Sequence, residues 1–208
     1  MTKLLYKSSI ILFMALFFTS CIKNSMESDV WSIALDCVNP VIYNKKNDIG
    51  FKFCLLNKDS IPSNTFKENE RFYFFFSIIN LSKGSVMIDE ANLFCDDFCM
   101  VYQNETQIGK PWYTKFCEYR AILNNLEIHN EPPYEVILPW RYIPQYDAGT
   151  GRIKRGFFCI QNPENENSNA FLSKGIYICR FNMDFIYKKN GKEIKIKDLF
   201  FEINFKIE

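Results

Sequence analysis

Hydrophobic and polar residues alternate along much of the chain beyond residue 30, and a period of two is typical of a β-strand with one buried face. Residues 71–81 (RFYFFFSIINL) are instead apolar at nearly every position, which predicts a central strand covered on both faces. The pattern therefore indicates a chain built mainly of strands. The runs with strand signals are residues 31–37, 51–55, 71–81, 86–88, 93–102, 134–138, 156–160, 176–187 and 194–207.

A turn signal joins the last two of these runs. Asn190-Gly191 is a pair in which both residues readily adopt positive φ, and it predicts a two-residue hairpin. Residues 114–126 have the apolar spacing of a helix, so at most one short helix or turn is expected. Some eight or nine strands separated by long loops predict an all-β chain, folded as an antiparallel β-sandwich over residues 31–208.

The first 21 residues have the three-part plan of an export signal. Two lysines form a short basic region, residues 10–18 form an apolar run, and two small polar residues precede Cys21. The apolar run is too short for a helix that crosses about 30 Å of hydrocarbon, which needs about 20 residues. Residues 1–20 are therefore predicted to be a signal peptide, and residues 21–30 a polar tether to the folded domain.

The residues that lead into Cys21, Phe-Thr-Ser-Cys, resemble the lipobox of bacterial lipoproteins. In that family the cysteine becomes the first residue of the mature chain and carries fatty acids such as palmitate. The resemblance implies a lipid-anchored protein of the bacterial cell envelope, at the outer membrane, and leaves open which side it faces. Phe18 departs from the Leu, Val or Ile that is commoner at that place, so an ordinary cleaved signal peptide with an incidental cysteine stays the alternative.

A later segment resembles immunoglobulin-like domains. In residues 172–179 (LSKGIYIC), Gly175, Tyr177 and Cys179 alternate as at the entry to strand F of such sandwiches. There the tyrosine hydroxyl bonds back to the backbone and forms a tyrosine corner. The alternative is a simple turn followed by an aromatic strand residue. No second cysteine or tryptophan stands at antibody-like spacing, so an inter-sheet disulfide of the antibody type is not expected.

Residues 74–88 combine a strand, an asparagine, a turn and a second strand. This arrangement is similar to the Bacillus proteinase-inhibitor (BsuPI-like) domain and to many Bacteroidetes lipoproteins. Together with the late Leu-x-x-Gly-x-Tyr, the resemblance covers about a quarter of the chain and implies an immunoglobulin-like β-sandwich rather than a particular function. It matches no inhibitory motif, so no inhibitory residue is carried over.

The charge balance bears on the partners. The chain has 25 Lys+Arg and 24 Asp+Glu, and removing residues 1–20 removes two lysines, which leaves 23 basic against 24 acidic residues, a net charge of −1. A nucleic-acid-binding face needs a basic surplus to neutralise phosphates, so no nucleic-acid partner is expected. The same balance gives no attraction to anionic headgroups, and membrane attachment is predicted to depend on the lipid on Cys21.

The cysteines and the single histidine limit the chemistry. Apart from Cys21, seven cysteines remain, an odd number, and we expect at most two disulfides in an exported chain, with pairings left open. His129 stands in a polar loop without a nucleophile motif, and no cysteine, histidine or acidic spacing matches a metal site. The chain is therefore predicted to need no cofactor or metal and to be no enzyme.

Aromatic residues in the long loops are the candidate binding groups. Flat rings can stack on sugars or anchor a protein partner, but they can equally fill the ends of the sandwich. The sequence thus predicts an envelope protein that presents loops to a protein or glycan partner. An inhibitor or regulator of an envelope protease is the second hypothesis, and an envelope enzyme the disfavoured third. The candidate binding residues are Trp112, Tyr113, Trp140, Tyr142 and Tyr146.

Overall fold

The computed structural model describes residues 22–24, 30–88, 97–111, 126–141 and 170–208. These residues form thirteen strands and contain no helix, as the all-β prediction requires. The strands are β1 (Ile22–Asn24), β2 (Val30–Ile33), β3 (Val41–Lys46), β4 (Ile49–Leu56), β5 (Thr65–Phe66), β6 (Tyr73–Asn80), β7 (Val86–Ile88), β8 (Met100–Gln103), β9 (Thr106–Gly109), β10 (Leu126–Ile128), β11 (Tyr134–Pro139), β12 (Gly175–Lys189) and β13 (Lys192–Ile207).

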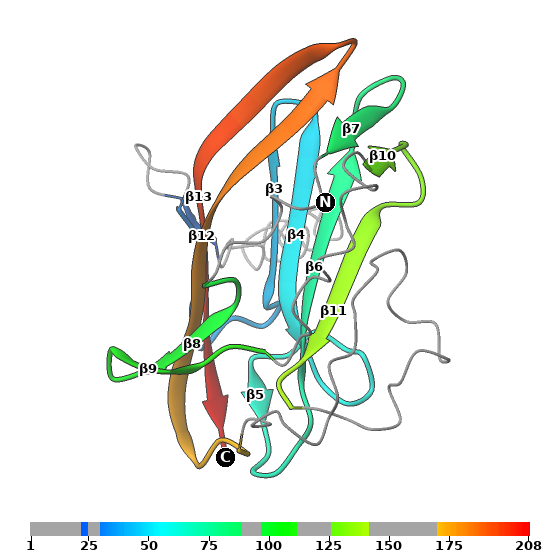
Figure 1. The fold of residues 1–208 in the computed structure, drawn as a ribbon. Coiled ribbons are helices and arrows are strands. Elements are labelled where there is room, and N and C mark those ends of the chain that lie inside the picture. The colour runs from blue at the N-terminus through cyan, green and yellow to red at the C-terminus, as the bar shows by residue number, and fades with distance from the viewer. Residues whose placement is uncertain (1–21, 25–29, 89–96, 112–125, 142–169) are drawn as a thin grey trace, which may run out of the picture.

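The strands form two sheets (Figure 1). The larger sheet has the order β1-β2-β13-β12-β7-β10, with β5 on β13, β8 on β12 and β9 on β8. The smaller sheet has the order β11-β6-β4-β3. One set of buried side chains joins residues from both sheets into a shared core, which is the organisation of a β-sandwich.

Most neighbouring strands are antiparallel, but β13 pairs in parallel with β2 and with β5. The prediction of an antiparallel sandwich is confirmed for most strand pairs, and these two parallel pairs are the exception. After β2 the chain crosses to β3 in the smaller sheet, so β2 has β1 on one side in the larger sheet and a strand from the far end of the sequence, β13, on the other. Such a neighbour is not joined by a hairpin, and its direction is therefore free to be parallel.

The hairpin of β12 and β13 confirms the turn prediction. Asn190 and Gly191 have φ values of 54° and 76°, which are the positive values that a tight two-residue turn requires. The pairing runs from Lys189 and Lys192 at the turn to Gly175 and Ile207 at the open end. This long ribbon forms the centre of the larger sheet and carries the strands that lie on either side of it (Figure 1).

Phenylalanine rings join the two sheets. Phe53 in the smaller sheet meets Phe181 in the larger one edge to face, with ring centroids 5.1 Å apart. Phe76 meets Phe201 in the same way, at 5.6 Å. Edge-to-face pairs at such distances contribute about 0.5–1.5 kcal/mol beyond the area that they bury. The high phenylalanine content of the chain is thus used in its core.

Strand β6 is covered on both faces, as its nearly continuous apolar run predicted. Phe74 and Phe76 point into the core between the sheets, whereas Tyr73 and Phe75 belong to a second apolar cluster on the outer face of the smaller sheet. Each face of a strand receives alternate residues, so an apolar residue at every position implies two apolar environments.

The structure also differs from several predicted boundaries. The predicted first strand ran to Cys37, but β2 ends at Ile33, and the N–H of Cys37 closes a turn onto the carbonyl of Ala34. Strands β1, β3, β5, β9 and β10 were not predicted. Strand β1 lies within the segment 21–30 that was expected to be a polar tether, because its backbone pairs with β2. Leu126, expected at the end of a short helix, begins β10. The rest of that expected helix and the run at 156–160 lie outside the described residues.

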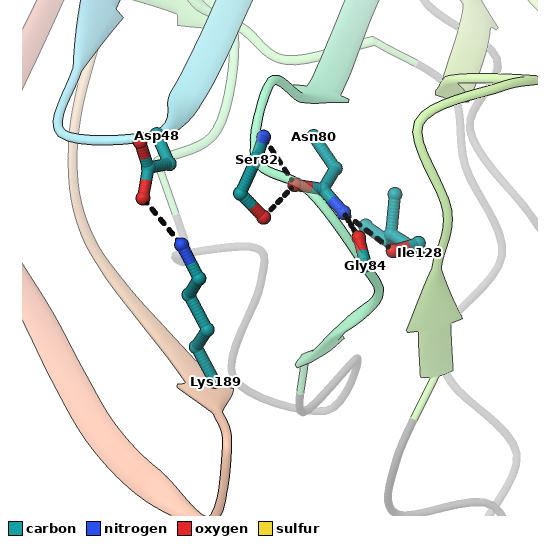
Figure 2. A network of polar contacts seen from close by, with 6 residues as sticks. All are labelled: Asp48, Asn80, Ser82, Gly84, Ile128 and Lys189. Carbon is teal, nitrogen blue, oxygen red and sulfur yellow. Dashed lines mark hydrogen bonds and ion pairs between the residues drawn. The ribbon is translucent and has the colours of Figure 1, made fainter.

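A polar network holds the ends of several strands together (Figure 2). The amide nitrogen of Asn80 donates to the carbonyls of Gly84, at 2.7 Å, and Ile128, at 3.0 Å. Its amide oxygen accepts from the N–H and the hydroxyl of Ser82, at 3.0 and 2.8 Å. Asn80 is buried at the end of β6, so these bonds link the smaller sheet to the turn before β7 and to β10.

Candidate functional site

A cavity of about 270 Å³ lies where β6 begins and β11 ends. Three short segments meet there: the residues just before β6, the end of β11 with the residues after it, and the chain that leads into β12. Cationic and aromatic side chains dominate its wall. The residues that line this cavity, which we call the Arg141 pocket, are Glu70, Arg71, Phe72, Pro139, Trp140, Arg141 and Phe171.

Two contacts fix the wall of the Arg141 pocket. The indole N–H of Trp140 donates to the carbonyl of Ala170 at 2.9 Å, which joins positions that are thirty residues apart. Beside it, the guanidinium of Arg141 lies over the ring of Phe171, 3.9 Å from the centroid. A cation over a ring at this distance is held by the negative face of the ring. Phe171 is 40% exposed, so the pair lies at the surface.

Of the charged side chains in the Arg141 pocket, Glu70 has a hydrogen-bond partner, whereas one donor of Arg141 has none among the described residues. Glu70 accepts a hydrogen bond from the N–H of Lys67 at 2.8 Å. The Nε atom of Arg141 is buried and has no hydrogen-bond partner among the described residues. A guanidinium keeps its charge at all physiological pH values and has five donors. A buried donor without an acceptor costs free energy, and the guanidinium that carries this donor belongs to a residue that lines the pocket.

The arrangement favours binding over nucleophilic chemistry. Arginine and aromatic side chains recognise and hold anionic or planar groups, whereas covalent catalysis needs an activated nucleophile. Burial raises the pKa of the Cys54 thiol to about 12, so this cysteine is protonated and inert. His129 is exposed, and its Nε2 atom lies 4.0 Å from the carboxylate of Glu127. Within the described part of the chain no three potential metal ligands lie together.

The sequence suggested Trp140 as a candidate binding residue in a loop, but its side chain is buried. Only 3% of its surface is exposed, and its ring stacks on Phe72 with centroids 5.9 Å apart and planes 12° apart. Its backbone N–H also donates to the carbonyl of Phe72. Trp140 therefore fills the end of the sandwich, which is the packing alternative left open above. The candidates Trp112, Tyr113, Tyr142 and Tyr146 lie outside the described residues, as does Cys21.

Tyr177 closes a turn at the start of β12. Its hydroxyl donates to the carbonyl of Ser173, four residues upstream, at 2.8 Å. The side chain is 2% exposed and stacks on Phe205. Gly175 lies two residues before Tyr177. A side chain at this position would place its Cβ only 2.6 Å from the side-chain nitrogen of Gln103 on β8. This is the local geometry of a tyrosine corner.

The described cysteines divide into two states. Cys37 is disulfide-bonded. Cys54 and Cys179 are buried cysteines outside any disulfide, and Cys179 lies in the core between the sheets. Cys179 therefore takes part in no disulfide of the antibody type, and these two side chains act as small core residues.

Of the residues that line the Arg141 pocket, only Trp140 was predicted as a site residue, and both arginines and Phe171 were among those that the sequence analysis missed. Single arginines next to strands are common, and nothing in their spacing distinguishes a binding arginine from a solvated one. One signal was present, because Trp140 and Arg141 are adjacent, and both residue types are enriched at binding hot spots. Their meeting with Phe171 depends on the fold.

Comparison with known proteins adds no assignment. The chain matches no known protein family, no curated protein and no solved structure. No helix in the described residues has the length and apolar character to cross a membrane. A function must therefore be inferred from the residues of the chain itself.

Proposed function

We propose that this chain is a non-enzymatic, lipid-anchored protein of the bacterial cell envelope. Its β-sandwich, of an immunoglobulin-like or BsuPI-like kind, presents one end to a protein or glycan partner. The anchor is lipid on Cys21, the residue directly before β1 of the larger sheet. No cofactor or nucleic acid takes part.

The observation that carries the binding role is the composition of the Arg141 pocket. Arg71 and Arg141 stand beside a wall of aromatic side chains, and one of them has a buried donor without a partner among the described residues. Arginine and aromatic residues are the groups that most often dominate binding energy at interfaces. A cavity of about 270 Å³ is close to the lower limit of small-ligand pockets and suits one inserted group of a larger partner.

Two features support an envelope location. The sequence Phe-Thr-Ser-Cys21 follows a basic region and an apolar run, which is the order of a lipoprotein signal. Cys37 is disulfide-bonded, and structural disulfides persist in oxidising compartments such as the bacterial periplasm. Two or more acyl chains anchor stably, since each buried methylene contributes about 0.8 kcal/mol.

Inhibition or regulation of an envelope protease is the second candidate. The hydrogen bond from Trp140 to Ala170 and the stacking of Arg141 on Phe171 join positions thirty residues apart at this end of the sandwich. A surface that is held in place in this way suits an inhibitor, because it loses less entropy on binding. The same surface would then contact a protease instead of another partner.

Photo-crosslinking in the intact bacterium tests the proposed function. A photoreactive phenylalanine analogue replaces Phe171, which is 40% exposed beside the pocket, and in a control strain it replaces Ile108 on β9, which is 41% exposed and does not line the pocket. We expect a discrete covalent adduct from position 171 in the membrane fraction and none from position 108. An absence of adducts at 171, or the same adducts at both positions, contradicts the proposal.

A further inference from the structure

We propose that the Arg141 pocket binds a carboxylate of a polypeptide partner, through the guanidinium of Arg141. This inference rests on the proposed function and names the chemistry of its partner. The carboxylate is either the C-terminus of the partner or an acidic side chain. Arginine and carboxylate match in geometry, since two parallel N–H donors meet two oxygens.

A second arginine in the same fold shows what Arg141 lacks. Arg180 lies over the ring of Tyr102, 4.2 Å from the centroid, much as Arg141 lies over Phe171 at 3.9 Å. The stacked Arg180 also donates to the carboxylate of Glu105 at 2.8 Å. Arg141 has the same stacking but forms no ion pair in the described part of the chain. The missing acceptor in this arrangement is therefore a carboxylate.

The charge of the Arg141 pocket favours a monoanion. Two cations, Arg71 and Arg141, stand against one carboxylate, Glu70, which gives a formal net charge of +1. A singly charged carboxylate neutralises this surplus, whereas a dianionic phosphate would exceed it and meet the carboxylate of Glu70. Glu70 can also accept an N–H, the group that accompanies every carboxylate in a polypeptide.

The aromatic wall favours a polypeptide over a glycan. Sugar recognition by stacking needs an open ring face. The ring of Trp140 is buried against Phe72, and one face of Phe171 is covered by Arg141. These rings therefore hold the guanidinium and enclose the pocket, and the polar contact with the ligand falls to the arginines.

Nuclear magnetic resonance of the purified full chain tests the inference. The probes are N-acetyl-Gly-Gly, which has a free C-terminal carboxylate, N-acetyl-aspartate amide, which has a side-chain carboxylate, and the neutral N-acetyl-Gly-Gly amide. We expect at least one acid to shift the Arg141 Nε–H and Trp140 indole signals saturably. The neutral amide should bind at least about tenfold more weakly, as expected for a lost hydrogen bond to a charged group.

Arg141→Gln should weaken binding of the acid by about tenfold or more, and Arg141→Lys should also weaken it, because lysine lacks the paired donors. Arg180→Gln, which removes an equally stacked but paired arginine, should leave binding unchanged. If Arg141→Gln fails to fold, Arg71→Gln at an exposed position gives the same test with a weaker loss.

Tighter binding of glucuronate or phenyl phosphate than of either peptide acid overturns the inference, and so does an unchanged affinity in Arg141→Gln. The two proposals fail separately. A crosslinked partner without carboxylate binding contradicts only this inference, whereas carboxylate binding without a crosslinked partner contradicts only the proposed function.

Discussion

Cys54 illustrates how position in the fold decides the chemistry of a residue. It faces outward from the smaller sheet, yet it packs with Leu56 and Tyr73 and is almost fully buried. Desolvation disfavours the thiolate, and it raises the pKa of this thiol to about 12. Since the thiolate is the nucleophile, the side chain should be unreactive near neutral pH.

We therefore predict that iodoacetamide at about pH 8 leaves Cys54 unmodified in the folded protein and modifies it once the chain is unfolded in guanidinium. Mass spectrometry of the peptide that contains Cys54 measures the modified fraction. Rapid modification under native conditions would show that the outer cluster of the smaller sheet is not closed.

Tyr177 carries a prediction about a single hydrogen bond. Replacing it by phenylalanine keeps the ring that stacks on Phe205 and removes the bond to the carbonyl of Ser173. We expect a loss of about 1 kcal/mol in the free energy of unfolding, measured in urea. Tyr43→Phe, at a half-exposed position on β3, is the control and should change little. An unchanged stability in Tyr177→Phe would mean that the corner contributes nothing.

At this scale the sequence predicted some contacts and missed others. The bond of Tyr177 spans four residues, so a local pattern could suggest it. The bond of Trp140 to Ala170 spans thirty residues, and the meeting of Arg141 with Phe171 is equally distant. Aromatic content alone could not decide whether Trp140 packs or binds, because that depends on which side chains surround it.

At the scale of strands, Asn80 joins elements that belong to different sheets. It ends β6, and its side chain bonds the turn before β7 and the carbonyl of Ile128 in β10 (Figure 2). All four hydrogen-bonding positions of the amide are used. A network that is fully satisfied and buried specifies one arrangement of the chain.

We predict that Asn80→Ala lowers the free energy of unfolding by about 2–4 kcal/mol, because it leaves buried backbone groups without partners. Urea denaturation measures the effect. Asn182→Ala, on the exposed side of β12, removes the same side chain where nothing depends on it and should change stability by less than about 0.5 kcal/mol. Equal effects in the two variants would contradict the role of the network.

Strands were predictable where their pattern was strong and local. The nearly continuous apolar run of β6 and the Asn-Gly hairpin of β12 and β13 follow from side-chain period and turn chemistry. Strand β3 (VIYNKK) lies at the edge of its sheet with a weak pattern, and β10 has three residues. Their pairing partners, rather than their own sequences, make them strands.

At the scale of the whole molecule, an ion pair connects the two sheets. Lys189, at the end of β12, donates to the carboxylate of Asp48, in the turn between β3 and β4, at 2.6 Å (Figure 2). The hydrogen bond and the charge of Lys189 hold the pKa of Asp48 below its usual value of 3.8. A carboxyl group with a lowered folded pKa stabilises the folded state above its unfolded pKa and loses this contribution as the pH falls through the folded value.

We predict that wild type is slightly more stable than Asp48→Asn at pH 7 and that this difference disappears in acid, below the lowered folded pKa of Asp48, where the carboxyl group is protonated in both states. Urea midpoints at pH 7 and in acid measure it, and high salt should reduce the difference at pH 7, since the pair is partly exposed. A difference that persists in acid would show that the substitution acts through packing and not through charge.

The overall architecture could be predicted further than its details. Alternating side chains required two packed layers, and the structure has them, but the parallel pairing of β13 with β2 depends on how the chain crosses between the sheets. The Arg141 pocket depends on that path as well, because it draws residues from three separated segments. Local patterns therefore indicate the class of fold, whereas the site arises from its topology.

Mass spectrometry of the mature N-terminus, after isolation from bacterial membranes, tests the central claim most directly. We predict that the first residue is Cys21 with fatty acids attached, and that Cys21→Ala moves the protein out of the membrane fraction. An unacylated mature terminus, or membrane retention that is unchanged in Cys21→Ala, would contradict a lipid-anchored sandwich that offers its Arg141 pocket to a partner.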